Sequence, residues 1–413
     1  MSQKRIAKTR IYEKIDESRG DAINLFQDLI RINSENPGER RGDESQIAHF
    51  VANYMQELGM KVQQIEPEPK RVSNLGRLVG ERRKPVLLFY AHMDTVPAGD
   101  PSSWHYPPLA AEIHDGKIYG RGTNDVKQGV ASTLYAIKAI VDSQIKLKGD
   151  VLVAHVADEE TGGTLGIKEL ISRGMLKADY CLYTHMGIPE NPSAPYLACI
   201  GHRGQITVQI ETKGKAIHAA WKETTHGINA IAKMNPIIEA IENMKFTGWK
   251  PHPIVPGGVT ISVTMISGGL KVNIVPDSCK IVCDCRFVPG YTPEKVLSSI
   301  NKVLNGLKSD DPELHFEVKE ITTACPSFIE PDEPIVDAVK EVYREFNHDR
   351  DIEVRGHIAT SDSRYIIHDA KIPTIMALTA RGGGSHSIDE HNIIENYITS
   401  IKMQAALIIN LLM

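Results

Sequence analysis

The pattern of hydrophobic and polar residues in the first half of the chain alternates between short apolar runs and segments with helical spacing. The apolar runs cover residues 85–91 (PVLLFYA), 150–157 (DVLVAHVA) and 180–184 (YCLYT). Runs of this kind are typical of strands buried on both faces of a parallel sheet. Strands that alternate with helices predict an α/β domain with a mostly parallel sheet covered on both faces. The helices expected between them cover residues 22–32, 44–59, 129–143 and 163–174.

The pattern changes near residue 203. Four segments now alternate between apolar and polar residues, as antiparallel strands with one buried face do; they cover residues 204–214, 258–269, 278–290 and 314–321. Two amphipathic helices are expected among them, at 227–244 and 292–307. The rest of the chain returns to the α/β pattern. We therefore expect residues 203–322 to form an α+β domain inserted into a catalytic domain made of residues 1–202 and 323–413.

Composition narrows the class of partner. The chain has 413 residues, a formal net charge of −5 and no basic tail, so neither nucleic acid nor an anionic membrane is an expected partner. Its first twenty residues lack the apolar core of a signal peptide, and no run approaches the ~18 apolar residues of a spanning helix. The six cysteines lack metal-binding spacing. Cys283 and Cys285, two positions apart on an expected strand, fit buried side chains of a reduced, cytoplasmic protein.

Polar residues follow several of the expected strands. In open α/β sheets, functional sites form beyond the carboxyl ends of the strands. Each residue also has an ordinary explanation, such as a buried core histidine, a capping aspartate or a solvated glutamate pair. Their convergence on one edge of the sheet favours a functional site instead. The residues are His92 and Asp94, Asp125 in a glycine-bounded loop, the doublet Glu159–Glu160, and His386 in a late loop.

Five motifs occur along the chain in a fixed order: YAHMDTVP, DGKIYGRGTNDVKQG, ADEETGG, GGLKVNIVPDSCKIVCDCR and GGSHSIDEH. Together they resemble the M20 metallopeptidase and deacylase family, which includes acetylornithine deacetylase, succinyl-diaminopimelate desuccinylase, aminoacylase and glutamate carboxypeptidase. The resemblance covers nearly the whole chain. It implies a zinc-peptidase-like catalytic domain, an inserted lid that also forms a homodimer, and two divalent metal ions. Zinc is the expected metal, manganese or cobalt are alternatives, and a single-metal form stays open.

The resemblance also implies the metal ligands. His92 would bind the first metal, Asp125 would bridge, and Glu160 and His386 would bind the second. The remaining ligand of the first metal is usually a carboxylate, but this chain has His185 at that position. Histidine is itself a good zinc ligand.

Two further roles in the catalytic domain follow from the resemblance, and one position stays open. Asp94 would hold His92 in the required tautomer, and Glu159 would act as general base toward the attacking water. The alternative for His185 is that it binds no metal, with its position empty or completed by Glu190.

Three residues of the expected lid match family positions that contact substrate. His218 would reach the active site of the other subunit and stabilise the developing oxyanion. Asn273 and Arg286 would bind substrate, the arginine through a carboxylate. The alternative is that they are ordinary residues of the lid. Asp362 and Arg364 match a further family motif whose role is left open.

The leading hypothesis is a cytoplasmic homodimer that hydrolyses an N-acyl or peptide bond in a small, carboxylate-bearing molecule. A dipeptidase or carboxypeptidase is the nearest alternative, followed by hydrolysis of another C–N bond, such as that of an aromatic amine. A catalytically inactive binding homologue is a third, but an intact Glu159 beside a ligand argues against it. Serine hydrolysis is excluded, because the chain has no G-x-S-x-G motif.

Overall fold

The computed structural model describes residues 3–38, 41–346 and 350–413. The chain forms two compact units. The first consists of Met1–Ile200, Ile329–Arg355 and Ser361–Met413, and the second of Gly201–Phe328 and Gly356–Thr360. The second unit therefore encloses the segment 203–322 that we expected as the insertion, and adds the short segment Gly356–Thr360.

The sheet of the first unit has the strand order β1-β2-β6-β3-β7-β16-β9. Its four central strands β6, β3, β7 and β16 are parallel, and antiparallel strands flank them on both sides. Every residue of β3 and β6 is buried, as their continuous apolar runs require. The predicted α/β class is confirmed. The strands are β1 (Lys61–Ile65), β2 (Ser73–Leu78), β3 (Val86–His92), β6 (Asp150–Val156), β7 (Tyr180–Tyr183), β9 (Tyr196–His202) and β16 (Thr374–Met376).

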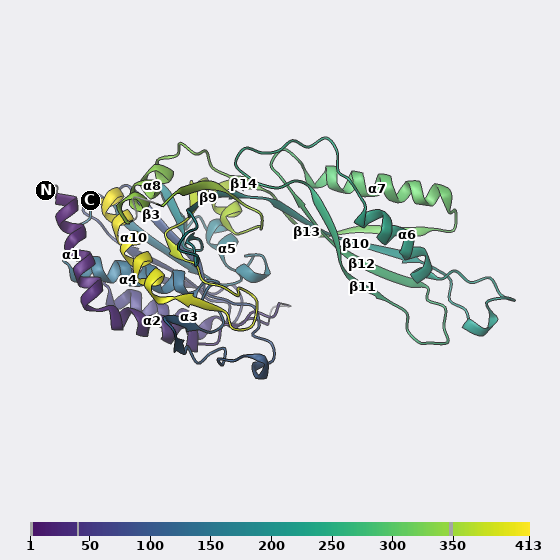
Figure 1. Cartoon of the computed structure of the whole chain (residues 1–413), viewed down its shortest axis with the longest axis horizontal. Helices are drawn as coiled ribbons and strands as arrows, with labels where there is room; N and C mark the ends of the chain where they lie inside the picture. Colours follow the sequence, from purple (N-terminus) through teal and green to yellow (C-terminus); the bar gives the residue numbers. More distant parts are fainter. Residues whose placement is uncertain (1–2, 39–40, 347–349) are drawn as a thin grey trace. The chain divides into compact units, whose positions relative to one another are not determined.

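Helices cover this sheet (Figure 1). A first group packs together, with α4 against both α2 and α10, and α10 also against α1 and α8. α3 covers β1 and β2, and α5 contacts α9. None of the helices in the described residues has the length and apolarity needed to cross a membrane. The helices are α1 (Gln3–Glu17), α2 (Arg19–Arg31), α3 (Ser45–Glu57), α4 (Lys127–Asp142), α5 (Ile167–Ser172), α8 (Pro334–Phe346), α9 (Ser363–His368) and α10 (Ile394–Leu412).

The remaining elements are short. Those of the first unit are β4 (Ile113–His114), β5 (Lys117–Tyr119), β8 (Gly187–Ile188), β17 (Thr379–Ala380), β18 (His391–Ile393) and the 3-10 turns η1 (Pro101–Ser103) and η2 (Glu159–Thr161). β14 (Ser327–Phe328) and the 3-10 turn η3 (Ala219–Trp221) belong to the second unit, and β15 (Ile352–His357) begins in the first unit and ends in the second. Four of the short strands form two pairs, β18 with β5 and β17 with β8.

The second unit is a four-stranded antiparallel sheet with two helices on one face (Figure 1). Its strand order is β11-β12-β10-β13. Buried and partly buried residues alternate along β10 and most of β12, so the apolar side chains of these strands form one face, which the helices cover. This is the α+β unit that the alternating pattern predicted. The elements are β10 (Gly204–Lys213), β11 (Thr260–Gly268), β12 (Ser278–Phe287), β13 (His315–Ala324), α6 (Ala230–Glu242) and α7 (Pro293–Asp310).

Candidate active site

Three adjacent parallel strands deliver candidate residues to one edge of the first unit's sheet. His92 is the last residue of β3, and His185 follows β7 by two positions. The pair Glu159–Glu160 lies in η2, just after β6. Because β6, β3 and β7 are neighbours and parallel, their carboxyl ends meet.

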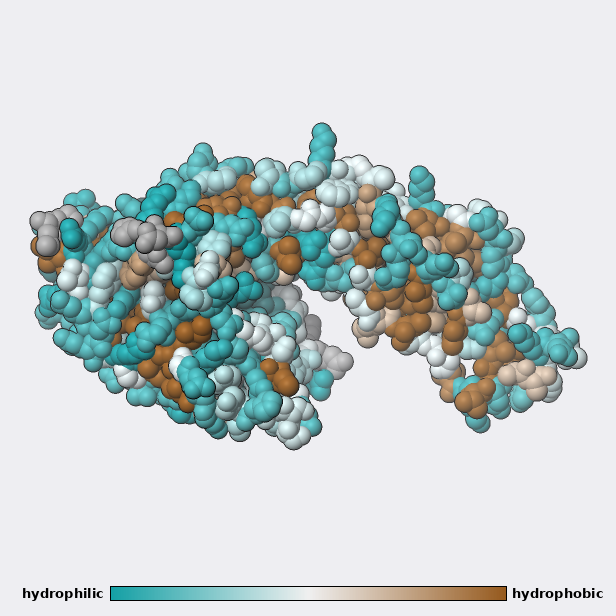
Figure 2. All heavy atoms as spheres, in the orientation of Figure 1, coloured by the Kyte–Doolittle hydropathy of each residue, from teal (hydrophilic) through white to brown (hydrophobic). Residues whose placement is uncertain are grey.

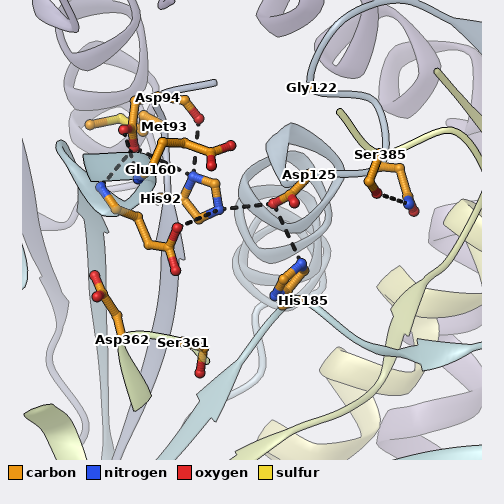
Figure 3. A network of polar contacts seen from close by, with 12 residues as sticks. His92, Met93, Asp94, Gly122, Asp125, Glu160, His185, Ser361, Asp362 and Ser385 are labelled. Atoms are coloured by element: carbon orange, nitrogen blue, oxygen red, sulfur yellow. Dashed lines mark hydrogen bonds and ion pairs between the residues drawn. The ribbon is translucent and has the colours of Figure 1, made fainter. Parts of the chain in front are cut away.

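Asp125 lies between histidines from different parts of the chain. One carboxylate oxygen, Oδ1, is 3.0 Å from His92 Nε2 and 3.4 Å from His185 Nε2. The other oxygen, Oδ2, is 3.4 Å from His386 Nε2. Figure 3 shows the first two contacts, with Asp125 joined to both rings. A carboxylate whose two oxygens face different ligand sets can bridge two ions.

Glu160 completes the side of Asp125 that faces His386. Its Oε2 lies 3.4 Å from His386 Nε2, and its Oε1 is buried without a hydrogen-bond partner in the described structure. Ligating atoms of His92, Asp125 and Glu160 all lie within 4.8 Å of one another. Imidazole nitrogens and carboxylate oxygens so close together fit a divalent metal such as zinc, manganese or cobalt.

The electrostatics of the cluster favour positive charge. Burial lowers the pKa of His92, but Glu159, Asp125 and Asp94 outweigh burial and raise it well above its usual value. Hydrogen bonds to Asp125 and Glu160 raise the pKa of His386 to about 10. Burial raises the pKa of Glu160 to about 7, although His386 opposes this effect. Carboxylates crowded in a partly buried site therefore attract cations, whether protons or metal ions.

The carboxylate of Asp94 mainly holds the glutamate pair. It accepts the backbone N–H groups of Glu159 and Glu160, both at 3.1 Å, and the Asn36 amide at 3.0 Å. The Nδ1 atom of His92 lies 3.0 Å from the main-chain oxygen of Asp94 and 3.4 Å from its carboxylate. The carbonyl is thus the nearer acceptor for the imidazole, a detail that the sequence did not indicate.

Glu159 lies at the edge of the cluster. Its Oε2 is 4.0 Å from His92 Nε2, and its Oε1 accepts a long hydrogen bond of 3.4 Å from Tyr183 Oη. The side chain is 16% exposed, so water can reach it. This position suits a proton acceptor next to the ligand cluster.

Comparison with known proteins agrees with this geometry. The sequence profile of peptidase family M20/M25/M40 matches residues 88–410. The chain belongs to this family. It is 27% identical to succinyl-diaminopimelate desuccinylase of Hydrogenovibrio crunogenus, over 95% of this chain and 99% of that protein. It is 28% identical to N-formyl-4-amino-5-aminomethyl-2-methylpyrimidine deformylase of Bacillus subtilis, over 73% and 71%.

The fold agrees as well. A solved M20 family metallo-carboxypeptidase from Sulfolobus solfataricus matches with a TM-score of 0.78 and 19% identity, over 94% of this chain and 98% of that one. As a member of the M20 family, the protein is a metal-dependent hydrolase of amide bonds.

The sequence did not indicate two tyrosines near Glu159, Tyr90 and Tyr183, or that Tyr90 binds Asp362, whose role was left open. Tyr90 Oη donates a hydrogen bond to Asp362 Oδ2 at 2.8 Å. The rings of Tyr90 and Tyr183 pack edge-to-face, with their centroids 4.6 Å apart. Burial and the charge of Glu159 raise the pKa of Asp362 to about 8. Strand alternation could have found Tyr90, which lies two positions before His92 on the same face of β3. It could not have found Tyr183 in this way, because β7 ends there and His185 lies in the turn that follows.

A buried ion pair network beneath the glutamate pair was also missed. Arg71 binds Glu44 through Nε and Nη2, both at 2.8 Å, and reaches Asp158 Oδ1 at 2.9 Å. Asp158 also accepts the backbone N–H of Leu165 at 2.8 Å. The network fixes the start of η2, but its members are far apart in sequence and no local pattern signals it.

Glu190, the alternative ligand, belongs to a different cluster. Its Oε1 accepts from Lys117 Nζ at 2.9 Å and lies 3.0 Å from His391 Nε2. His185 instead lies beside Asp125.

Arg364, whose role was left open, donates from Nη1 to the main-chain oxygen of Ser361 at 2.7 Å.

The candidate residues of the second unit fall into two places. His218 Nε2 lies 3.5 Å from Asn273 Nδ2, and the main-chain oxygen of Asn273 accepts the Ala219 N–H at 2.9 Å. The Asn273 Oδ1 atom is buried without a partner in the part of the chain described. Arg286 instead pairs with Asp284, at 2.6 Å through Nε.

Proposed function

We propose that this protein hydrolyses an N-acyl or peptide bond in a small, carboxylate-bearing molecule, with the help of two divalent metal ions. The observation that carries the proposal is the position of Asp125, whose oxygens face His92 and His185 on one side and His386 on the other. The ligands of the first ion would be His92, His185 and Asp125, and those of the second Asp125, Glu160 and His386.

The expected metal is zinc, with manganese or cobalt as alternatives that the same donors accept. Such ions polarise a substrate carbonyl and activate water when they are bound. The unpartnered Oε1 of Glu160 and the charge of the surrounding carboxylates support this assignment.

Glu159 would act as the general base. It would take a proton from the attacking water and return it to the leaving amine. Its partial exposure supports this role, and so does its fixed backbone, since Asp94 binds the N–H of both Glu159 and Glu160. Tyr183 would orient the carboxylate through Oε1.

The second unit would supply the groups that hold the substrate. His218 would stabilise the oxyanion from the partner subunit, and Asn273, which lies against it, would bind substrate with it. Arg286 would pair with a substrate carboxylate in exchange for Asp284.

We further propose a cytoplasmic homodimer that assembles through the second unit. β11 is an edge strand of its sheet, and an edge offers unpaired backbone groups to a second copy. Met265, Ile266, Leu270 and Val272, on and just after this strand, are exposed. Figure 2 shows apolar side chains gathered on this part of the surface. Exposed apolar patches mark interaction surfaces.

Metal removal tests the proposal. The protein is stripped with a chelator, reconstituted with zinc, manganese or cobalt, and assayed on N-acyl amino acids and dipeptides. We expect activity to vanish and return with metal. Glu159→Gln should keep its metal and lose ~10²–10⁴-fold in turnover, whereas Glu169→Gln on α5, a surface control, should behave as wild type. Full activity without metal would refute the proposal.

A further inference from the structure

A single buried carboxylate joins two loops of the site. We call residues 120–126 the Asp125 loop and residues 382–391 the His386 loop. Glu390, at the end of the His386 loop, is fully buried, and it accepts four hydrogen bonds from the other loop. Its Oε1 accepts the backbone N–H groups of Asn124 at 2.8 Å and Asp125 at 3.0 Å. Its Oε2 accepts Gly122 N–H at 3.1 Å and Arg121 Nη1 at 2.5 Å.

Other contacts tie the same two loops together. The side chain of Asn124 donates to Ser385 Oγ at 2.6 Å and accepts the Gly382 N–H at 2.8 Å. Gly120 donates its N–H to the main-chain oxygen of Glu390 at 2.9 Å. Figure 3 shows Gly122 and Ser385 on neighbouring segments. The two loops therefore form one block, with Glu390 at its centre.

This block lies directly behind the shared carboxylate. Glu390 holds the backbone N–H of Asp125 itself, and it lies four residues after His386 in the same loop. The distance of 3.4 Å between Asp125 Oδ2 and His386 Nε2 depends on how the two loops are held. Glu390 is buried away from water and substrate, so it acts through Asp125 and not on the reacting atoms.

We propose that Glu390 is the positioning residue of the metal pair: it fixes Asp125 relative to His386, and so makes the second ion's position available. The inference rests on the proposed function, in which Asp125 and His386 share that ion. Without the hydrogen bonds of Glu390, the two loops have to become ordered when the second ion binds. The affinity of the protein for that ion therefore falls. Groups that orient metal ligands typically contribute 10–100-fold to affinity.

The substitution Glu390→Gln tests this with little change in shape. All four partners of Glu390 are hydrogen-bond donors. The glutamine amide keeps one acceptor oxygen, but its NH₂ group then faces donors and cannot bind them. Glu390→Asp is the second variant, in case the first does not fold. It keeps the charge but is one methylene too short to reach every donor, so we expect an intermediate effect.

The chain offers a matched control. Asp150 is also fully buried. It accepts hydrogen bonds from Arg77 Nη1 at 2.7 Å and from the backbone N–H of Gly80 at 2.8 Å, and Arg83 Nε lies 3.8 Å from it. It lies at the start of β6, and Glu159 follows the other end of that strand. Asp150→Asn should cost stability without changing metal binding. A second control is Asp389→Asn. Asp389 precedes Glu390 in the His386 loop and contacts His105, so this variant shows the effect of a general disturbance of that loop.

The readout is Mn²⁺ binding to the stripped full-length protein, followed by electron paramagnetic resonance. We expect wild type and both controls to bind two ions that couple magnetically through their shared carboxylate. Glu390→Gln should bind the first ion within about threefold of wild type and the second ~10–100-fold more weakly, with the coupled signal lost in proportion.

The outcomes separate the two claims. A wild-type protein that never binds a coupled pair would refute the metal centre, and this inference with it. A coupled wild type, together with a Glu390→Gln variant that binds the second ion normally, would refute this inference alone. Equal weakening of both ions, or the same weakening in Asp150→Asn, would also refute it, because the effect would then be one of general stability.

Discussion

The carboxylate of Asp94 accepts the backbone N–H of Glu160 at 3.1 Å. Its other oxygen accepts the N–H of Glu159 at the same distance, so one aspartate sets the position of both the proposed ligand and the proposed base. Burial raises the pKa of Asp94, but the hydrogen bonds from His92, Asn36 and Glu160 outweigh it and lower the pKa. The aspartate therefore stays charged.

We predict that Asp94→Asn lowers turnover by about 10–100-fold, the usual effect of losing a partner that orients metal ligands. The amide offers a donor where Asp94 has only acceptors, so one of the two glutamates moves. Turnover at saturating zinc, with metal content by elemental analysis, measures the effect. Normal turnover would show that the two N–H bonds do not control the position of the glutamates.

A pair of variants decides between His185 and Glu190 as ligand. His185→Ala should lower the occupancy of one metal, because His185 lies 3.4 Å from Asp125. Glu190→Ala should leave both metals bound, because Glu190 binds Lys117 and His391 instead. Metal stoichiometry after dialysis measures both. Unchanged stoichiometry in His185→Ala would remove this residue from the centre.

His155 predicts an effect of pH on stability. Its ring is buried in β6, both nitrogens lack partners among the described residues, and burial lowers its pKa from 6.5 to about 3. The unfolded chain therefore takes up a proton below pH 6.5 that the folded protein refuses until about pH 3. Stability should be unaffected well above pH 6.5 and fall as the pH drops through this window.

We predict that His155→Leu removes this dependence. Between pH 7 and pH 5, wild type should lose about 2 kcal/mol more unfolding free energy than the variant. The variant should also be more stable at pH 8, since no unsatisfied polar atoms stay buried. Unfolding followed by circular dichroism at several pH values measures the difference. Parallel pH profiles would mean that His155 has a proton-accepting partner in solution.

The proposed role of His218 across a proposed homodimer predicts complementation between two inactive variants. Glu159→Gln subunits lack the base but supply His218, and His218→Ala subunits have the base but lack the donor. In a hybrid, one site combines an intact Glu159 with an intact His218 from the other chain. Removing one oxyanion donor costs roughly 10²–10³-fold, so mixing the two variants should restore a substantial fraction of activity. Hybrids that form but stay inactive would contradict the cross-subunit role.

The hydrophobic periodicity predicts a strand or helix wherever the element is buried on all sides or along one continuous face. β3 and β6 are continuous apolar runs, and β10 and β12 alternate, so both sheets were predictable. The antiparallel strands β1 and β2, on one side of the sheet, were not predicted. β1 is largely exposed, and β2 carries Asn74, Gly76 and Arg77, which weaken an apolar pattern. The helix α8 was also missed, although its apolar residues are strongly one-sided.

The candidate site could be predicted only as far as its motifs reached. The resemblance indicated His92, Asp125, Glu160 and His386, and the structure brings their side chains together. The residues that position these ligands could not be predicted from the sequence, because they contact residues far away in the chain. The motif GGSHSIDEH contains Glu390, for example, but does not indicate that its four hydrogen-bond donors lie in a loop far upstream.

That separation has a consequence for biosynthesis. Asp125 and Glu390 are 265 positions apart in the chain, yet one hydrogen bond joins them. In a growing chain, His92, Asp125 and the pair Glu159–Glu160 are therefore made long before the His386 loop, whose Glu390 binds the Asp125 loop. The growing chain holds only part of the proposed ligand set until residues 386–390 have been made. The proposed second ion therefore has a place to bind only after Glu390 has left the ribosome and reached Asp125.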